Sequence, residues 1–485
     1  MKDQLKRGLE GDKLNILVLT FLYVLQGVLY GVSIAIRITL QGMKVPYHDQ
    51  AKYSMVYWPY SMKLLLAPLF DATLSKRIGK RKMWIVPVQT LIGVILICIG
   101  YKIQSWLTDG QTPQVNMITT MFILLITLSS IQEIVIDGWS LHFLRKENVP
   151  YAALCNNCGR AFGIILGYVV LLLLESENFC NRWLRFNDQN GGILSFKGYF
   201  YFWGIVFLFS AATIGIFKRE IFDGSLINVH FLNIYYIAWK IIQLDTIKRF
   251  CLIITTYEIG FAAIDAVSYP KFLEYGIDRD NIVLVDLSMY PIEMFVIYFI
   301  AKHTIGPKPM SLFIKIMPYR ILTGIFAGML VFYTPKYVSK NNSSSPYFFM
   351  VFELYNIFQK LLTMIMRLSI LSFFSRVSDP SAGSTYMSIL NTLFSLENSI
   401  TKTSAYALVG LLTFKHCTRE SYIDDQDTSE DCLVIIDGYY IELGLCIVFS
   451  ISWHLLTKRF IINLQARNIE EWHVNKENQI FEIEK

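Results

Sequence analysis

Charged residues are scarce in this 485-residue chain: Asp, Glu, Lys and Arg together make up 17% of it, whereas soluble globular proteins carry about 25%. That shortage argues against a cytosolic enzyme, a disordered chain and a nucleic-acid-binding protein. Eight cysteines are too few for a small disulfide-rich scaffold. Apolar residues are abundant instead, with 54% hydrophobic and 15% aromatic residues. This balance indicates a membrane protein that crosses the bilayer several times.

Long apolar runs recur along the chain, and a transmembrane helix needs roughly 20 mostly apolar residues. We therefore expect an all-α integral membrane protein with twelve transmembrane helices. The first run is too long for a cleaved signal peptide, so we expect it to be kept as a span. The predicted spans are residues 14–40, 53–70, 83–101, 117–143, 151–174, 198–217, 250–270, 281–301, 316–334, 347–373, 380–414 and 438–457.

The loops between the spans differ in their content of Lys and Arg. Most of these residues lie on the side that would hold both termini. Because loops rich in Lys and Arg stay in the cytosol, we expect both termini to be cytosolic. Overlapping glycosylation sequons at Asn341 and Asn342 fall in a loop on the opposite side. Cys417 and Cys432 share another loop on that side, where they form a disulfide or remain two separate thiols.

The longest inner loop divides the chain into two sets of six spans. The predicted parts are an N-terminal six-helix bundle (1–217), a cytosolic linker (218–249), a C-terminal six-helix bundle (250–460) and a cytosolic tail (461–485). This layout is similar to the major facilitator fold, whose two pseudo-symmetric halves are built from three-helix repeats. In that architecture the first helix of each repeat lines a central cavity. Spans one, four, seven and ten should therefore carry polar residues on one face.

Polar side chains do follow one face of each of these four spans, given an advance of about 100° per residue. Charge inside a membrane costs about 2.5–3.5 kcal/mol per residue on insertion scales, so it is rarely without a role. The stripes predict a polar path between the halves, and the alternative is that their charges pair and lock helices together. They comprise Gln26, Tyr30, Ser33 and Arg37; Ser130, Glu133, Asp137 and Ser140; Thr255, Glu258 and Asp265; and Glu353, Asn356, Lys360, Thr363 and Arg367.

Asp71 ends the second predicted span, and a glycine turn with five basic residues follows it up to Lys82. This loop resembles the loop signature of major facilitators, in which an acidic residue pairs with or caps a neighbouring helix end. The alternative is an ordinary basic loop that stays on the inner side.

Small residues form a ridge on the fifth span, where Gly159, Gly163 and Gly167 predict close helix packing. Asn156 and Arg160 lie beside this ridge, and Arg160 faces either the cavity or the inner surface. Two neighbouring cysteines have CxxC spacing, but no second such pair is present to complete a metal site. We therefore expect no metal.

Several strings resemble the acetyl-coenzyme A transporter family of the endoplasmic reticulum membrane, in the family's order and over most of residues 11–460. The resemblance implies import of acetyl-CoA from the cytosol into the reticulum lumen for protein and ganglioside acetylation. Exchange for free CoA is compatible with this role, because the lumen must return the spent carrier, but the sequence does not show it. The resemblance implies no chemistry by the carrier and no cofactor. The strings include GDKLNILVLTFLYVLQG at 11–27, Trp58-Pro59, Gln132-Glu133 with Asp137-Gly138-Trp139, Asp265-Ala266-Val267, Met317-Pro318-Tyr319-Arg320, Val377-Ser378-Asp379-Pro380 and Asp437-Gly438-Tyr439-Tyr440.

A cargo with several phosphates needs Arg and Lys partners. Expected partners of the protein are this cargo and the bilayer but no nucleic acid, and a homodimer stays open. The candidate substrate-binding residues are Arg37, Gln26, Tyr30, Arg160, Asn156, Arg320, Lys360 and Arg367. The candidate coupling or gating residues are Glu133, Asp137, Glu258, Asp265, Glu353 and Asp71. Charged residues stand where the family pattern leads us to expect uncharged ones at Arg37, Arg160, Glu397 and Lys402.

Three other functions are compatible with the sequence. The buried carboxylates would suit a proton-coupled major facilitator that carries a peptide or a sugar conjugate. A membrane-bound acyltransferase would use the same cofactor chemically, but no HExxH, P-loop or GxSxG pattern occurs in the chain. A receptor or scaffold without transport is the third alternative.

Overall fold

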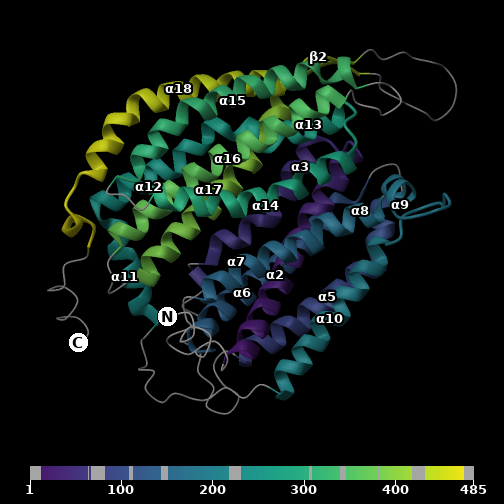
Figure 1. The fold of residues 1–485 in the computed structure, drawn as a ribbon, viewed down its shortest axis with the longest axis horizontal. Helices are drawn as coiled ribbons and strands as arrows, with labels where there is room; N and C mark the ends of the chain where they lie inside the picture. The colour runs from purple at the N-terminus through teal and green to yellow at the C-terminus, as the bar shows by residue number, and fades with distance from the viewer. Residues whose placement is uncertain are drawn as a thin grey trace.

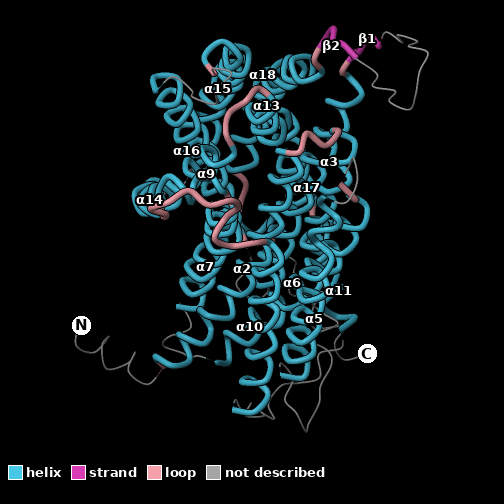
Figure 2. Tube along the Cα trace, turned by 90° about the vertical axis from the view of Figure 1, so that its right-hand side faces the viewer, coloured by secondary structure: helices cyan, strands magenta, loops and turns pink. Residues whose placement is uncertain are grey.

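The computed structural model describes residues 12–63, 65–66, 82–108, 113–143, 151–217, 231–304, 308–338, 346–378, 383–417 and 432–473. Over these residues the chain is mostly helical, as predicted. The exception is a short antiparallel hairpin formed by β1 (Phe414–Cys417) and β2 (Cys432–Ile436). We call the end of the molecule that carries this pair the hairpin end (Figure 2).

The first half of the chain forms helices that pack around α2, which is the first long helix. Two elements of this first half are not α-helices: η1 is a 3-10 helix and η2 is a π-helix. The elements are α2 (Lys13–Gly42), α3 (Tyr47–Ser54), η1 (Met55–Met62), α5 (Lys82–Thr108), α6 (Val115–Phe143), α7 (Tyr151–Ile164), η2 (Ile165–Val170), α8 (Leu171–Glu175), α9 (Glu177–Trp183) and α10 (Phe196–Phe217).

The second half repeats this style of packing, and its first long segment is interrupted. The 3-10 helix η3 and the π-helix η4 separate α12 from α13. The elements are α11 (Phe231–Gln243), α12 (Asp245–Tyr257), η3 (Glu258–Phe261), η4 (Ala263–Val267), α13 (Ser268–Glu274), α14 (Arg279–Thr304), α15 (Met310–Tyr337), α16 (Pro346–Val377), α17 (Gly383–Leu412), α18 (Gly438–Gln465) and η5 (Ile469–Trp472).

Eight helices within the described residues are long and apolar enough to cross a membrane. The bent pair Asp245–Phe261 and Ala263–Glu274, whose two parts meet at 54°, adds a ninth candidate if it is one broken span and not a re-entrant loop. Helices α14 and α17 lie where spans eight and eleven are predicted, but neither is among these candidate spans over the described residues. Twelve spans therefore remain a prediction.

Each half has its own apolar core. One core joins residues of α2, α5, α6 and α10, and the other joins residues of α12, α15, α16 and α18. Figure 1 shows the purple and blue helices of the first half beside the green and yellow helices of the second. Large apolar side chains remain exposed on the outer helices, such as Phe209 on α10 and Leu456 on α18. An exposed apolar belt of this kind fits contact with lipid.

The two halves meet through a few helices. Helix α17 of the second half packs against α3 and η1, and α14 packs against η2 and α8. Near the hairpin end, α13 also packs against α2. The hydroxyl groups of Ser54 and Thr403 lie 2.6 Å apart across the α3–α17 contact. These contacts place the polar faces of both halves along a common boundary.

Glycines bring α2 and α7 into close contact, as the ridge on the fifth span predicts. A Cβ atom added to Gly163 would lie 2.2 Å from the carbonyl oxygen of Val24 and 2.7 Å from Gly27 Cα. A Cβ added to Gly167 would lie 2.4 Å from the carbonyl oxygen of Val28. The two backbones therefore leave no room for a side chain, and this contact fixes Arg160 relative to α2.

Candidate functional site

The first charge cluster lies inside the N-terminal half and centres on Glu133 of α6. This residue is 5% exposed. Arg160 Nη1 donates to Glu133 Oε1 at 3.1 Å, and the ammonium group of Lys63 pairs with the other oxygen. Two cations thus hold one buried carboxylate, which offsets the cost of burying it.

Aromatic rings surround these two cations. The guanidinium carbon of Arg160 lies 5.8 Å from the ring centres of both Tyr30 and Tyr60. The ammonium nitrogen of Lys63 lies 4.7 Å from the Tyr60 ring. Cation–π attraction therefore adds to the ion pairs. Sequence reasoning placed Tyr30 and Arg160 in one site, and the structure brings them together.

Asp137 lies one helical turn beyond Glu133 on the same face. Its Oδ1 atom accepts hydrogen bonds from the Tyr23 hydroxyl at 2.7 Å and from Asn156 Nδ2 at 3.2 Å. Gln26 is fully buried nearby on α2. The polar stripes of the first and fourth spans therefore meet within one half, around side chains that bond to one another.

The second charge cluster lies inside the C-terminal half around Arg320, which is 1% exposed. Arg320 Nη2 donates to Glu258 Oε2 at 3.0 Å and to Asp265 Oδ2 at 2.5 Å. The Tyr257 hydroxyl donates to Glu258 Oε1 at 2.8 Å, and Gln359 Nε2 donates to Asp265 Oδ1 at 2.7 Å. The arrangement links five elements, which are α12, η3, η4, α15 and α16, and protein encloses its guanidinium group.

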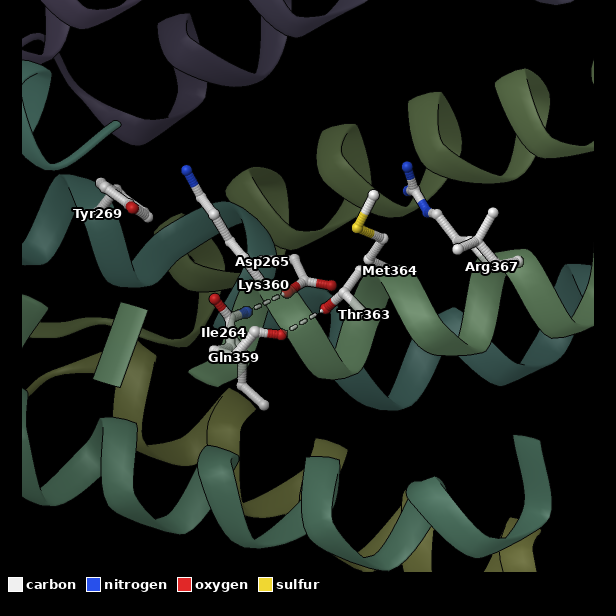
Figure 3. A pocket seen from close by; sticks show the side chains of 9 residues that line it. Ile264, Asp265, Tyr269, Gln359, Lys360, Thr363, Met364 and Arg367 are labelled. Atoms are coloured by element: carbon white, nitrogen blue, oxygen red, sulfur yellow. Dashed lines mark hydrogen bonds between the residues drawn. The ribbon is translucent and has the colours of Figure 1, made fainter. Parts of the chain in front are cut away.

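A cavity of about 370 Å³ opens beside this second cluster, lined by residues of η4, α13 and α16. Such a volume lies in the range of ligand pockets. Figure 3 shows Asp265, Gln359 and Thr363 linked by hydrogen bonds, with Lys360 and Arg367 extending away from them. The Arg367 side chain is 47% exposed, and one of its nitrogens lies 4.0 Å from Glu258. This cation is therefore accessible to a ligand.

Asp286 of α14 joins the two halves. Its carboxylate pairs with Lys360 of α16 and accepts a hydrogen bond at 2.8 Å from the Tyr168 hydroxyl of η2. Because Tyr168 belongs to the first half and Lys360 to the second, movement of the halves would change these contacts.

A second cavity, of about 100 Å³, lies between the halves. Arg37 of α2 and Lys402 of α17 line it, with Tyr30 and Tyr57 beside them. The guanidinium carbon of Arg37 lies 6.0 Å from the Tyr57 ring, and its Nε atom is buried without a hydrogen-bond partner. Within the described part of the chain, neither Arg37 nor Lys402 forms an ion pair.

Polar contacts between the halves also close the hairpin end. Arg279 Nη2 donates to Glu175 Oε2 at 2.7 Å, and the Tyr47 hydroxyl donates to Glu274 Oε2 at 3.0 Å. Burial, together with the Glu274 carboxylate, raises the pKa of Tyr47 well above its usual value. Its hydroxyl therefore stays a donor at alkaline pH. A cavity of about 980 Å³ lies at this end, lined by both halves.

The other predicted site residues have different places. Glu353 accepts a hydrogen bond from Ser288 Oγ at 3.4 Å, next to the Asp286 link. The residues Asp71, Asn341 and Asn342 lie outside the described part of the chain. Cys417 and Cys432 are direct partners in the β1–β2 register. Partners in an antiparallel pair have Cα atoms about 4.5–5.5 Å apart, which suits a disulfide, and the bond itself remains a prediction.

Sequence reasoning missed Lys63 and Asp286 as members of the site. Each is a lone charge in a mostly apolar stretch, and such an isolated charge indicates a residue with a role inside the membrane. Neither lies on the four spans expected to line a cavity, so the polar stripes do not select them. The structure shows them as the ion-pair partners of Glu133 and Lys360.

The two helical halves and their contacts have the arrangement of the major facilitator fold. A bacterial homolog of the human lysosomal transporter Spinster, in an inward-facing and unoccupied conformation, has this fold. It matches with a TM-score of 0.59 and 11% identity, over 96% of this chain and 98% of its own. A variant of the nucleoside transporter NupG matches with a TM-score of 0.58 and 11% identity, over 93% and 99% of the two chains.

The family model Acatn, described as acetyl-coenzyme A transporter 1, matches residues 15–230, 223–320 and 312–474. The chain therefore belongs to the acetyl-coenzyme A transporter family. An uncharacterized protein of Schizosaccharomyces pombe is 28% identical over 479 residues, which is 96% of this chain and 89% of the relative. An uncharacterized membrane protein of Saccharomyces cerevisiae is 24% identical over 538 aligned positions, with 94% and 96% of the two chains covered.

Proposed function

We propose that this protein carries acetyl-CoA from the cytosol into the lumen of the endoplasmic reticulum by alternating access, in exchange for CoA. It supplies acetyl groups for acetylation in the lumen and performs no chemistry itself. In this proposal twelve spans form two six-helix bundles, both termini are cytosolic, and the sequons at Asn341 and Asn342 face the lumen.

The observation that carries the proposal is the cavity of about 370 Å³ with Arg367 and Lys360 in its wall. An acetyl-CoA molecule carries phosphate groups, and a guanidinium group suits them because it can donate two parallel hydrogen bonds. Arg367 is half exposed and only loosely paired with Glu258. Arg320 is enclosed between Glu258 and Asp265, so within this proposal it holds the cavity wall in place.

Uptake by purified protein in proteoliposomes tests the proposal. We expect labelled acetyl-CoA to enter, and uptake to rise when CoA is loaded inside. Arg367→Gln should lower uptake roughly tenfold, which corresponds to about 1.4 kcal/mol. Lys315→Gln is the matched control, because Lys315 is an exposed cation on α15 away from the cavity. Uptake no greater than in protein-free vesicles would rule out this cargo.

A proton-coupled carrier for another solute is the second candidate. Glu397 of α17 is 3% exposed, and its Oε2 atom has no hydrogen-bond partner among the described residues. A buried carboxyl group in this setting can carry a proton between the two sides of a membrane. Uptake of a peptide or sugar conjugate that is driven by an imposed pH gradient, without acetyl-CoA uptake, would favour this candidate.

A further inference from the structure

The interior cations of this protein fall into two groups. Arg160, Lys63, Arg320 and Lys360 each lie against a carboxylate. Arg37 and Lys402 differ, because neither forms an ion pair with any residue that the structure describes, although both line the same small cavity. Two unpaired cations within a membrane protein require a counter-ion.

Among the residues that the structure describes, none near this pair supplies such a counter-ion. The carboxylates whose charge reaches Lys402, which are Glu258 and Asp265, are already hydrogen-bonded to Arg320. Apart from the repulsion by Lys402, the titratable neighbours that act most strongly on Arg37 are phenol groups, with Tyr57 foremost. The Nε atom of Arg37 is buried without an acceptor. An unsatisfied buried donor on a cation calls for an acceptor that carries negative charge.

The size and lining of the cavity indicate what that acceptor is. Its volume of about 100 Å³ equals about three water molecules at ~30 Å³ each, which admits one phosphate group but not a nucleotide. Ser54, Asn398 and Ser399 add small hydrogen-bonding side chains to its wall. A guanidinium, an ammonium and these polar groups together form a typical setting for a phosphate.

We propose that Arg37 and Lys402 form an anion site that binds one phosphate group of the cargo between the two halves. The cargo role of this site rests on the proposed function. Arg37 belongs to α2 and Lys402 to α17, and α17 packs on α3 and η1 of the first half. The bound phosphate cancels the repulsion between the two cations and so favours closure of the halves around the cargo. A ligand can shift a conformational equilibrium only through such a difference in binding between states.

Binding measurements on the full chain in phosphatidylcholine nanodiscs test this site. The probes are acetyl-CoA, inorganic phosphate and pantetheine, which is the phosphate-free arm of the cargo. Arg37→Gln and Lys402→Gln should each weaken binding of acetyl-CoA and of phosphate by roughly tenfold or more, since each removes a charged partner of a buried anion. Any binding of pantetheine should stay unchanged. The control Lys315→Gln should bind all probes as the wild type does.

Thermal unfolding separates this role from a structural one. Without ligand, both variants should be at least as stable as the wild type, because each removes half of a repulsive pair. Arg37→Lys and Lys402→Arg keep the charges and should retain most of the affinity. Unchanged binding in both Gln variants would overturn the anion site, and so would unfolding of the ligand-free Gln variants when the charge-conserving variants are stable.

The probes also separate this site from the acetyl-CoA proposal. If neither substitution changes the affinity for acetyl-CoA, the anion site is overturned and the proposed function is not affected. Phosphate binding that depends on both residues, without any acetyl-CoA binding, supports the anion site and overturns the cargo. Nanodiscs with phosphatidylglycerol form a further arm, and loss of phosphate binding there would assign the site to a lipid headgroup and overturn its role in cargo binding. Binding of none of the probes would overturn both proposals.

Discussion

Arg279 at the start of α14 donates a hydrogen bond to Glu175 at the end of α8, with 2.7 Å between Nη2 and Oε2. The two residues belong to different halves of the chain. Beside them, Ser176 donates to Asp280 across the same boundary. Under the proposed alternating-access mechanism these contacts would break when the hairpin end opens, so we expect them to act as a gate there.

The gate can be weakened by Arg279→Gln. Both side chains are partly exposed, so the ion pair is worth about 1 kcal/mol and its loss should shift the equilibrium toward opening about fivefold. Lys44→Cys places a thiol in the cavity at the hairpin end. The rate at which this thiol reacts with a membrane-impermeant maleimide should increase by the same factor.

The matched control for this gate is Arg182→Gln, which removes an exposed cation of α9 whose described contact is the Trp183 ring. Labelling should not change in this control. Equal labelling in the Arg279 variant and the wild type would show that the ion pair does not hold this end closed.

Removal of Arg320 should destabilise the protein. Arg320→Ala leaves Glu258 and Asp265 buried without their cation, and breaking a buried pair in this way costs about 3–5 kcal/mol. The unfolding temperature in detergent should fall strongly. Adding Glu258→Gln and Asp265→Asn should restore part of the loss, because the uncompensated charges are then gone. A single variant as stable as the wild type would contradict the structural role of this cluster.

The close contact of α2 and α7 should not tolerate a side chain at Gly163. In Gly163→Ala the new Cβ would meet the Val24 carbonyl oxygen at 2.2 Å, so the helices must move apart. Overpacking of this kind typically costs about 1–3 kcal/mol. Gly444→Ala on α18 is the control, because its Cβ would meet nothing within 4 Å. If chromatography in detergent shows equal folded yields of both variants, the close contact is not required.

Helical periodicity was enough to predict part of the site. It placed Glu133 and Asp137 on one face, and Glu258 and Asp265 on another, as the structure has them. Periodicity could not say which helices meet, so the partners Lys63 and Asp286 went unrecognised. Nor could it show that Arg320 is enclosed by two carboxylates, because that depends on the packing of three elements.

The bend in the seventh predicted span was also beyond sequence reasoning. The 3-10 turn η3 and the π-turn η4 interrupt this segment. At the interruption Ser450 of α18 donates to the carbonyl oxygen of Gly260 at 2.9 Å. This hydrogen bond from a helix that is distant in the sequence gives the backbone carbonyl group at the bend a donor. The local sequence of this span gives no sign of that contact.

A disulfide between Cys417 and Cys432 is expected to stabilise the hairpin end. The two residues face each other in the β1–β2 register, and closing a loop of about 15 residues contributes about 3 kcal/mol in the chain-entropy model. Peptide mapping without reduction should recover the two cysteines in one linked peptide, and Cys417→Ser should lower the unfolding temperature. The control Cys98→Ser changes an exposed free thiol. Recovery of Cys417 and Cys432 as free thiols would contradict this expectation.

The central claim is that two halves alternately open at opposite ends around a shared anionic cargo, and paired distance measurements by spin labelling test it most directly. One label pair at Lys44 and Leu411 reports on the hairpin end, and a second pair at Leu17 and Leu252 reports on the opposite end; all four residues are exposed. On addition of acetyl-CoA we predict a change in both distance distributions, in opposite directions. Distances that stay fixed at both ends, or that lengthen together, would contradict the account.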